Sequence, residues 1–131
     1  MSAQIATPPA DRLSPVISRV DISWICVATN DGHPLHLDFE FATKEAGFKD
    51  VLVPGHMLIG WTAEFLQDWI GAIEGIDRWQ IRFVTPVWPG EQLTLHGAAL
   101  EASETGDHAA VTLTAQDGRV VGKATARFKL S

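Results

Sequence analysis

Hydrophobic positions follow a helical period in the first half of the chain and an alternating period in the second. Large apolar side chains stand three and four positions apart over residues 57–69, and most polar residues between them fall on another face. This spacing predicts a buried central helix that begins at Pro54-Gly55 and ends near Ile70-Gly71. The first half therefore centres on one long helix.

Two shorter helices are expected before the central one. Ser18 followed by Asp21 resembles a capping box at the start of an apolar run, which predicts a helix to about Thr29. Asp38 is suited to cap a second short helix over residues 39–46.

The second half has the pattern of an antiparallel meander. Apolar and polar residues alternate in segments separated by Pro-Gly and Asp-Gly turns, and Asp117-Gly118 is the clearest hairpin signal. The predicted strands are residues 77–83, 92–100, 109–115 and 120–130, with a further turn at Thr105-Gly106-Asp107.

One long helix followed by antiparallel strands predicts an α+β domain with a hot dog fold, in which a curved antiparallel sheet wraps a long central helix. Residues 1–10, which include Pro8-Pro9, are expected to be a flexible N-terminal tail, and residues 11–131 a single domain. Such a sheet leaves an open edge, so we expect a homodimer or a dimer of dimers.

Composition narrows the class of protein. With 131 residues, 46% hydrophobic, the chain has the size of one domain, and a net charge of −6 without a basic run argues against nucleic acid as a partner. No segment approaches the ~20 apolar residues of a membrane span, and the N-terminus has no signal-peptide pattern. The single cysteine, Cys26, is expected in the core, which fits a cytoplasmic protein. Core positions are also expected for four tryptophans: Trp24, Trp61, Trp69 and Trp79.

Candidate chemistry concentrates between Asp31 and Asp38. His33, His36 and Asp38 are metal-ligand types, but their spacing matches no zinc signature. A polar turn without catalytic function is a second interpretation, because Gly and Pro constrain the segment. The third is a carboxylate and an imidazole that act on one water as general base and acid.

Gly55 adds a hydrogen-bond donor for an oxyanion to the third interpretation. A helix N-terminus offers free backbone N–H groups and the positive end of the helix dipole to an oxygen that gains negative charge. A turn that merely starts the helix is the alternative. Base, acid and oxyanion donor together suit addition of water to, or its removal from, a carbonyl-activated double bond.

The string Asp31-Gly32-His33-Pro34-Leu35-His36 resembles the Asp-x-Asn-Pro-Leu/Ile-His signature of MaoC-like, (R)-specific enoyl-CoA hydratases. Two further segments are similar to that family, residues 53–60 and 82–91. The resemblance implies hydration of trans-2-enoyl thioesters of coenzyme A or acyl carrier protein to (R)-3-hydroxyacyl thioesters, or the reverse dehydration. It also implies that no metal or other cofactor is needed.

The resemblance implies a role for each matching residue. Asp31 activates the water that attacks C3, His36 supplies the proton to C2, and Gly55 N–H holds the thioester oxygen, with His56 in the same substrate-binding segment. His33 stands where the family has Asn, and with Pro34 it is expected to support the loop. The residue before Gly55 is Pro54, where the family often has His.

Alternatives remain open at this point. A hot dog thioesterase would use Asp31 to direct water at the thioester carbonyl. The chain is also a candidate subunit of a hetero-oligomeric hydratase, including one for bulky or steroid acyl groups, because Asp68-Trp69-Ile70-Gly71 resembles a segment of some small subunits in steroid side-chain degradation. Four cations are candidates for binding coenzyme A phosphates: Lys44, Lys49, Arg78 and Arg82.

Overall fold

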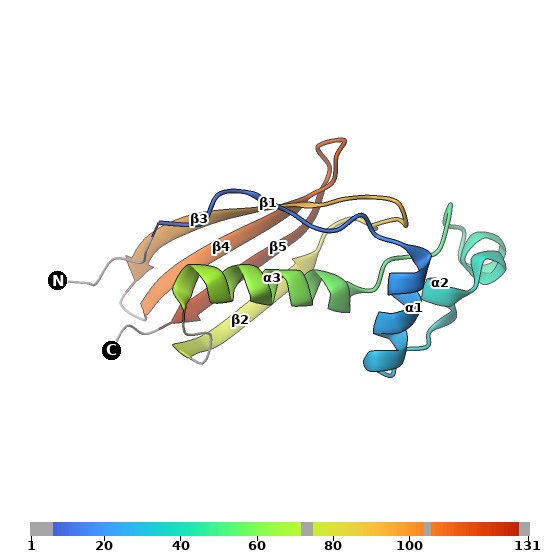
Figure 1. Ribbon diagram of the computed structural model, residues 1–131, viewed down its shortest axis with the longest axis horizontal. Coiled ribbons are helices and arrows are strands. Elements are labelled where there is room, and N and C mark those ends of the chain that lie inside the picture. The colour runs from blue at the N-terminus through green and yellow to red at the C-terminus, as the bar shows by residue number, and fades with distance from the viewer. Residues whose placement is uncertain (1–6, 72–74, 104–105, 129–131) are drawn as a thin grey trace.

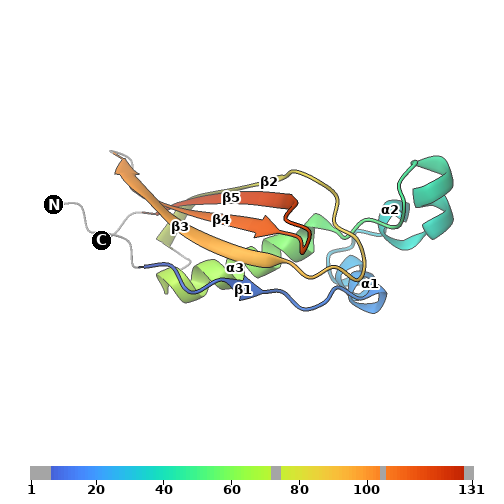
Figure 2. The ribbon, with the colours of Figure 1, turned by 90° about the horizontal axis from the view of Figure 1, so that it is seen from above.

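A curved antiparallel sheet with a long helix along one face makes up most of the molecule (Figures 1 and 2). The computed structural model describes residues 7–71, 75–103 and 106–128. The strands lie in the order β1-β3-β4-β5-β2, and every neighbouring pair is antiparallel. Their bounds are Arg12–Leu13 for β1, Ile76–Phe83 for β2, Thr94–Ser103 for β3, Gly106–Thr114 for β4 and Val120–Phe128 for β5.

The central helix α3 spans Gly55–Ile70, as its spacing predicts. Gly71, with φ of 78°, ends it in the left-handed conformation that glycine adopts without strain. Phe65 and Trp69 are buried against the sheet, where Gly97 of β3 makes room for them. A Cβ on Gly97 would lie 2.8 Å from the Phe65 ring, so the absence of a side chain lets helix and sheet approach closely.

Helix α1, Arg19–Ala28, starts where the capping pattern predicts, because the Ser18 hydroxyl accepts a hydrogen bond from Asp21 N. Ile22 and Cys26 are buried, and the Cys26 prediction is confirmed. The core prediction for Trp24 is wrong: it is 68% exposed. The helix has apolar residues on two sides, and only one side packs on the rest of the chain.

The other tryptophans meet the expectation to different degrees. Trp69 is buried, while Trp61 and Trp79 are partly buried and pack against the core.

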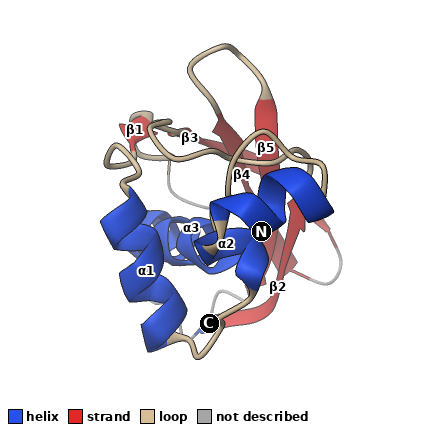
Figure 3. Cartoon of the chain, turned by 90° about the vertical axis from the view of Figure 1, so that its right-hand side faces the viewer, coloured by secondary structure: helices blue, strands red, loops and turns tan. Residues whose placement is uncertain are grey.

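Helix α2, Pro34–Leu37, is a short turn of helix that the sequence pattern does not predict. The second expected short helix begins after Asp38, whose carboxylate accepts from Phe41 N, and continues as the π-helical turn η1, Phe41–Glu45. Helices α1 and α2 lie beyond the sheet, at the N-terminal end of α3 (Figure 1), and Figure 3 views this end along α3.

Strand β1 is also absent from the sequence prediction. Arg12 pairs with Leu95, more than 80 positions away, so no local pattern reveals it. Near this strand, His96 Nδ1 lies 2.7 Å from Asp11 Oδ1. Of the expected tail, residues 1–6 lie outside the described residues, as do Thr105 of an expected turn and residues 129–130 of the last strand.

The architecture confirms the predicted α+β hot dog class, with an open rather than closed sheet. Strand β2 lies at one edge, and two-residue β1 lies at the other. Within the described residues, no helix combines the length and apolar character needed to cross a membrane.

Candidate active site

Asp31 lies in the loop that follows α1. Asn30 adopts a positive φ of 54°, which Asn tolerates better than most residues, and Asp31 N donates to Cys26 O at 2.9 Å. The Asp31 side chain is 32% exposed. Burial, and to a lesser degree the nearby Asp31 carboxylate, raise the pKa of the Cys26 thiol, which keeps it protonated and disfavours a role as nucleophile.

His36 is positioned by a contact with the segment before α3. Its Nδ1 lies 2.8 Å from Leu52 O, and because a carbonyl only accepts, Nδ1–H is the donor. Leu52 N in turn donates to Leu35 O at 2.8 Å, so α2 and this segment hold each other in place. The other ring nitrogen, Nε2, faces Asp31 Oδ2 at 3.7 Å.

A second imidazole approaches the same carboxylate oxygen. His56, in the first turn of α3, places Nδ1 3.8 Å from Asp31 Oδ2. Both separations are too long for a direct hydrogen bond but suit a bridging water. Asp31 therefore lies between one half-exposed histidine from α3 and one largely buried histidine from α2.

Gly55 begins α3, where the first N–H groups have no partner within the helix. A Cβ at this position would lie 2.5 Å from Cζ of Phe83. Because Gly55 has no side chain, the aromatic ring of Phe83, at the end of β2, packs directly against this turn of the helix. Phe83 is 51% exposed, so it has open space beside it.

A mainly apolar cavity of about 300 Å³ adjoins these residues. His36 and Gly55 line it, and residues 83–87, from the last residue of β2 onward, form another part of its wall. Two contacts fix that wall: Val53 N donates to Val87 O at 2.9 Å, and the Thr85 hydroxyl donates to Val120 O at 3.0 Å.

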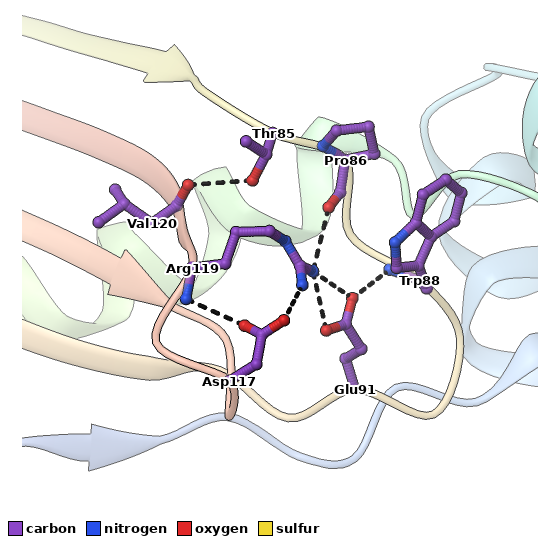
Figure 4. A network of polar contacts seen from close by, with 7 residues as sticks. All are labelled: Thr85, Pro86, Trp88, Glu91, Asp117, Arg119 and Val120. Atoms are coloured by element: carbon purple, nitrogen blue, oxygen red, sulfur yellow. Dashed lines mark hydrogen bonds and ion pairs between the residues drawn. The ribbon is translucent and has the colours of Figure 1, made fainter. Parts of the chain in front are cut away.

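A polar network behind the wall holds the β2–β3 connection (residues 84–93) to the β4–β5 turn (Figure 4). Arg119 Nη2 donates to both carboxylate oxygens of Glu91 at 2.8 Å, and Trp88 N donates to Glu91 Oε1 at 2.8 Å. Arg119 also pairs with Asp117. The hydrogen bonds to Glu91 contribute most to raising the pKa of Arg119, so the guanidinium stays charged.

The remaining predicted site residues have defined places. His33 Nδ1 accepts from Leu35 N at 3.1 Å and so caps α2, and Pro34 is the first residue of that helix. Among the residues that the structure describes, no three His, Cys, Asp or Glu side chains are grouped to hold a metal ion.

The cation candidates do not converge on the site. Lys44 lies 3.7 Å from Glu40, and Lys49 stacks over the Trp88 ring at 4.9 Å. Arg78 and Arg82 are exposed on β2.

Sequence reasoning missed three features of the site: the Leu52 carbonyl, the convergence of His56 on Asp31, and the Glu91–Arg119 network. The Pro-Gly-Glu turn at residues 89–91 belongs to a segment that resembles the family, but Arg119, the partner of Glu91, lies in another turn. The one sign of this contact in the sequence is the composition of that second turn, Asp117 to Arg119.

A comparison with models of protein families identifies the family of this chain. The model of the MaoC like domain matches residues 2–120, which is most of the chain. The chain belongs to the MaoC-like domain family. No curated protein matches it.

Solved structures similar to this MaoC-like domain share its fold. The ChsH1-ChsH2 complex from Mycobacterium tuberculosis has a chain with a TM-score of 0.80 and 20% identity, with all of both chains covered. An (R)-hydratase from A. caviae involved in PHA biosynthesis has a TM-score of 0.77 and 22% identity over 99% of this chain and 98% of that one. The truncated HadBC complex from M. tuberculosis, a 3R-hydroxyacyl-ACP dehydratase, has a TM-score of 0.69 and 16% identity over 96% and 98%.

Proposed function

We propose that this MaoC-like protein hydrates trans-2-enoyl thioesters to (R)-3-hydroxyacyl thioesters, or catalyses the reverse dehydration. The observation that carries the proposal is the placement of Asp31 Oδ2 3.7 Å from His36 Nε2, with the other nitrogen of His36 held by Leu52 O at 2.8 Å. Family membership and the (R)-hydratase and dehydratase among similar structures support it.

The hydration step needs one water between the two catalytic groups. A water placed about 2.8 Å from each group fits the gap between Asp31 and His36. The thioester oxygen accepts a hydrogen bond from Gly55 N–H, which draws electron density from C3 and stabilises the enolate-like charge. The substrate is a thioester of coenzyme A or of acyl carrier protein.

Protons balance over the cycle. Asp31 takes one proton from the water while the water oxygen bonds to C3, and His36 in its imidazolium form gives the Nε2 proton to C2. Asp31 then returns its proton to His36 through solvent. Dehydration runs the same transfers backwards. Because no electrons are gained or lost overall, the proposed reaction requires no redox cofactor, and Gly55 N–H supplies the electrophilic assistance that a metal ion would otherwise give.

The thioesterase alternative has less support. It needs a carboxylate to direct water at the thioester carbonyl, which Asp31 could do, but it gives His36 no task. Imidazole orientation by a backbone acceptor is a common way to fix a catalytic tautomer. The contact with Leu52 O therefore favours the two-residue mechanism.

Substitution of each catalytic residue tests the proposal. Purified Asp31→Asn and His36→Gln variants are assayed by loss of enoyl-thioester absorbance with crotonyl-CoA and longer 2-enoyl-CoA. Loss of an acid or base is expected to reduce kcat by about 10²–10⁴-fold. Hydrolysis of the thioester would lower the same absorbance, so loss of absorbance accompanied by an equal release of free thiol in the wild type would favour the thioesterase instead.

A matched pair of controls lies on the sheet. Asp11 and His96 form a 2.7 Å aspartate–histidine contact that is exposed and outside the site. Asp11→Asn and His96→Gln are expected to keep wild-type turnover. Equal losses in the control pair and in the site pair would contradict the assignment of Asp31 and His36.

We also propose that the chain pairs with a second hot dog chain through the β2 edge. Self-pairing into a homodimer or dimer of dimers is the first choice. An unlike hot dog chain is the second, because some similar structures are complexes of two named chains. Light scattering on the purified chain distinguishes a monodisperse dimer from a monomer awaiting its partner. A cytoplasmic location is part of the proposal, because a lone buried thiol suits a reducing compartment.

A further inference from the structure

A groove between α1 and α3 is separate from the cavity that Gly55 lines. It has a volume of about 550 Å³, within the roughly 300–1,000 Å³ typical of small-molecule sites. Its two helical walls are mainly apolar, with Trp24, Ile25 and Ala28 from α1 and Met57, Gly60 and Trp61 from α3, and Asp21 and His56 are the polar residues on them.

The groove adjoins the candidate catalytic residues. His56 lines it and holds Nδ1 3.8 Å from Asp31 Oδ2. His36 lines the other cavity and lies 3.7 Å from the same oxygen. A substrate bound at Asp31 therefore has two spaces beside it, one on the His36 side and one on the His56 side.

We propose that the α1/α3 groove binds the part of the acyl group beyond the reacting C2–C3 bond, and that the substrates are enoyl thioesters with long or ring-bearing apolar acyl groups. The inference rests on the proposed function and adds the substrate class. Gly60 is the residue that determines how large an acyl group the groove accepts.

The chemistry of the groove favours an acyl group over the carrier arm. Among the described residues that line it, Asp21 and His56 are the polar ones, and none is Lys, Arg, Ser, Thr, Asn or Gln. A pantetheine arm brings two amides that need hydrogen-bond partners, and its phosphates need cations. A hydrocarbon needs neither, and the flat faces of Trp24 and Trp61 suit one well.

Exposure supports an occupant of the groove. Trp24 is 68% exposed and Val16, which also lines the groove, is 57% exposed. Adjacent exposed apolar side chains of this size mark binding sites more often than plain surface. Continuity with Asp31 through His56 favours substrate as the occupant over a second copy of the chain.

Gly60 allows the groove to be filled without disturbing the fold. A Cβ built on Gly60 meets no atom within 4 Å, so a larger side chain enters open space. Leu is also a better helix former than Gly, and Gly60→Leu is therefore expected to melt no lower than the wild type. Glu64→Leu, one turn further along α3 at an exposed position outside the groove lining, is the matched control.

The test measures binding of saturated acyl-CoAs, which cannot react, by titration calorimetry. In the wild type, Kd is expected to fall about fourfold for each methylene added from butyryl-CoA to decanoyl-CoA. In Gly60→Leu, decanoyl-CoA should bind more than about tenfold more weakly, because the added side chain displaces several buried methylenes. Butyryl-CoA should bind both proteins alike, and Glu64→Leu should match the wild type.

Three results would overturn the inference. Equal weakening of free CoA, butyryl-CoA and decanoyl-CoA in Gly60→Leu would place the carrier arm in the groove. A change of oligomer mass in Gly60→Leu with unchanged acyl-CoA binding would place a second copy there. Absence of chain-length dependence in the wild type would leave the groove outside the substrate site.

The experiment separates the inference from the proposed function. A wild-type protein that shows the chain-length dependence but hydrates no enoyl thioester would refute the hydratase assignment and support the acyl groove. A protein that hydrates crotonyl-CoA but shows no chain-length dependence would refute the groove and leave the hydratase assignment intact.

Discussion

Replacing Gly55 with Ala tests how the start of α3 packs against β2. The new Cβ would lie 2.5 Å from Cζ and 2.7 Å from Cε2 of Phe83, so the ring must move. Overpacking of this kind costs about 1–3 kcal/mol, while Ala is favoured over Gly within a helix by up to about 1 kcal/mol. We expect Gly55→Ala to lower the free energy of unfolding by about 1–2 kcal/mol.

Removal of the ring should abolish that cost. Phe83 is 51% exposed, so about half of a side chain of roughly 200 Å² is buried, which is worth about 2.5 kcal/mol. Phe83→Ala should destabilise by about that amount. In the Phe83→Ala background, Gly55→Ala should be neutral or slightly stabilising, which gives a coupling energy of about 1–3 kcal/mol.

The measurement is urea unfolding of the four proteins of this double-mutant cycle, followed by tryptophan fluorescence. Equal destabilisation by Gly55→Ala in both backgrounds would refute the packing argument. Hydration assays on the same proteins separate packing from substrate binding. If the Cβ also blocks the thioester oxygen at Gly55 N–H, the double variant stays slow although the cost of the clash has gone.

Three further predictions concern a helix cap and two ion pairs. His33→Asn should keep turnover near wild type because Asn also caps a helix. His33→Ala should lower the free energy of unfolding by about 1 kcal/mol. Higher turnover at saturating substrate in His33→Asn would contradict a supporting role for His33. Hydrogen bonds from Arg19 are the main cause of the lowered pKa of Asp50. The pair therefore stabilises the fold at a pH above the ordinary carboxyl pKa of about 4, and this stabilisation is lost as the pH falls through the lower pKa of the folded state. Asp50→Asn should therefore destabilise more at about pH 7 than at about pH 3 in urea titrations, and a constant difference would count against the pair. Glu91→Gln should weaken the contact with Arg119 and lower the free energy of unfolding by about 1–3 kcal/mol, measured against Arg119→Ala in a double-mutant cycle that should show coupling.

Local chemistry allowed several elements to be predicted from the sequence. The hydroxyl of Ser18 and the glycine at position 71 set the first residue of α1 and the last of α3, because capping and left-handed backbone are properties of a few adjacent residues. The hairpin at Asp117-Gly118 was predictable for the same reason, and Gly118 has a φ of 89°.

The candidate site was predictable only in part. Asp31 and His36 lie five positions apart in one constrained loop, so the sequence already indicated that they could share a water. Neither the Leu52 carbonyl that orients His36 nor the approach of His56 to Asp31 was visible, because these contacts join residues 16 and 25 positions apart across separate elements.

The sequence by itself therefore determined the long elements, α1, α3 and β2 to β5, and the family signature, all of which depend on neighbours along the chain. Tertiary structure decided which apolar side of α1 faces the core. Trp24 lies on the other side and is therefore exposed beside a groove. It also decided that Arg12 pairs with β3. Periodicity shows that a side is apolar, but only packing determines which other element covers it.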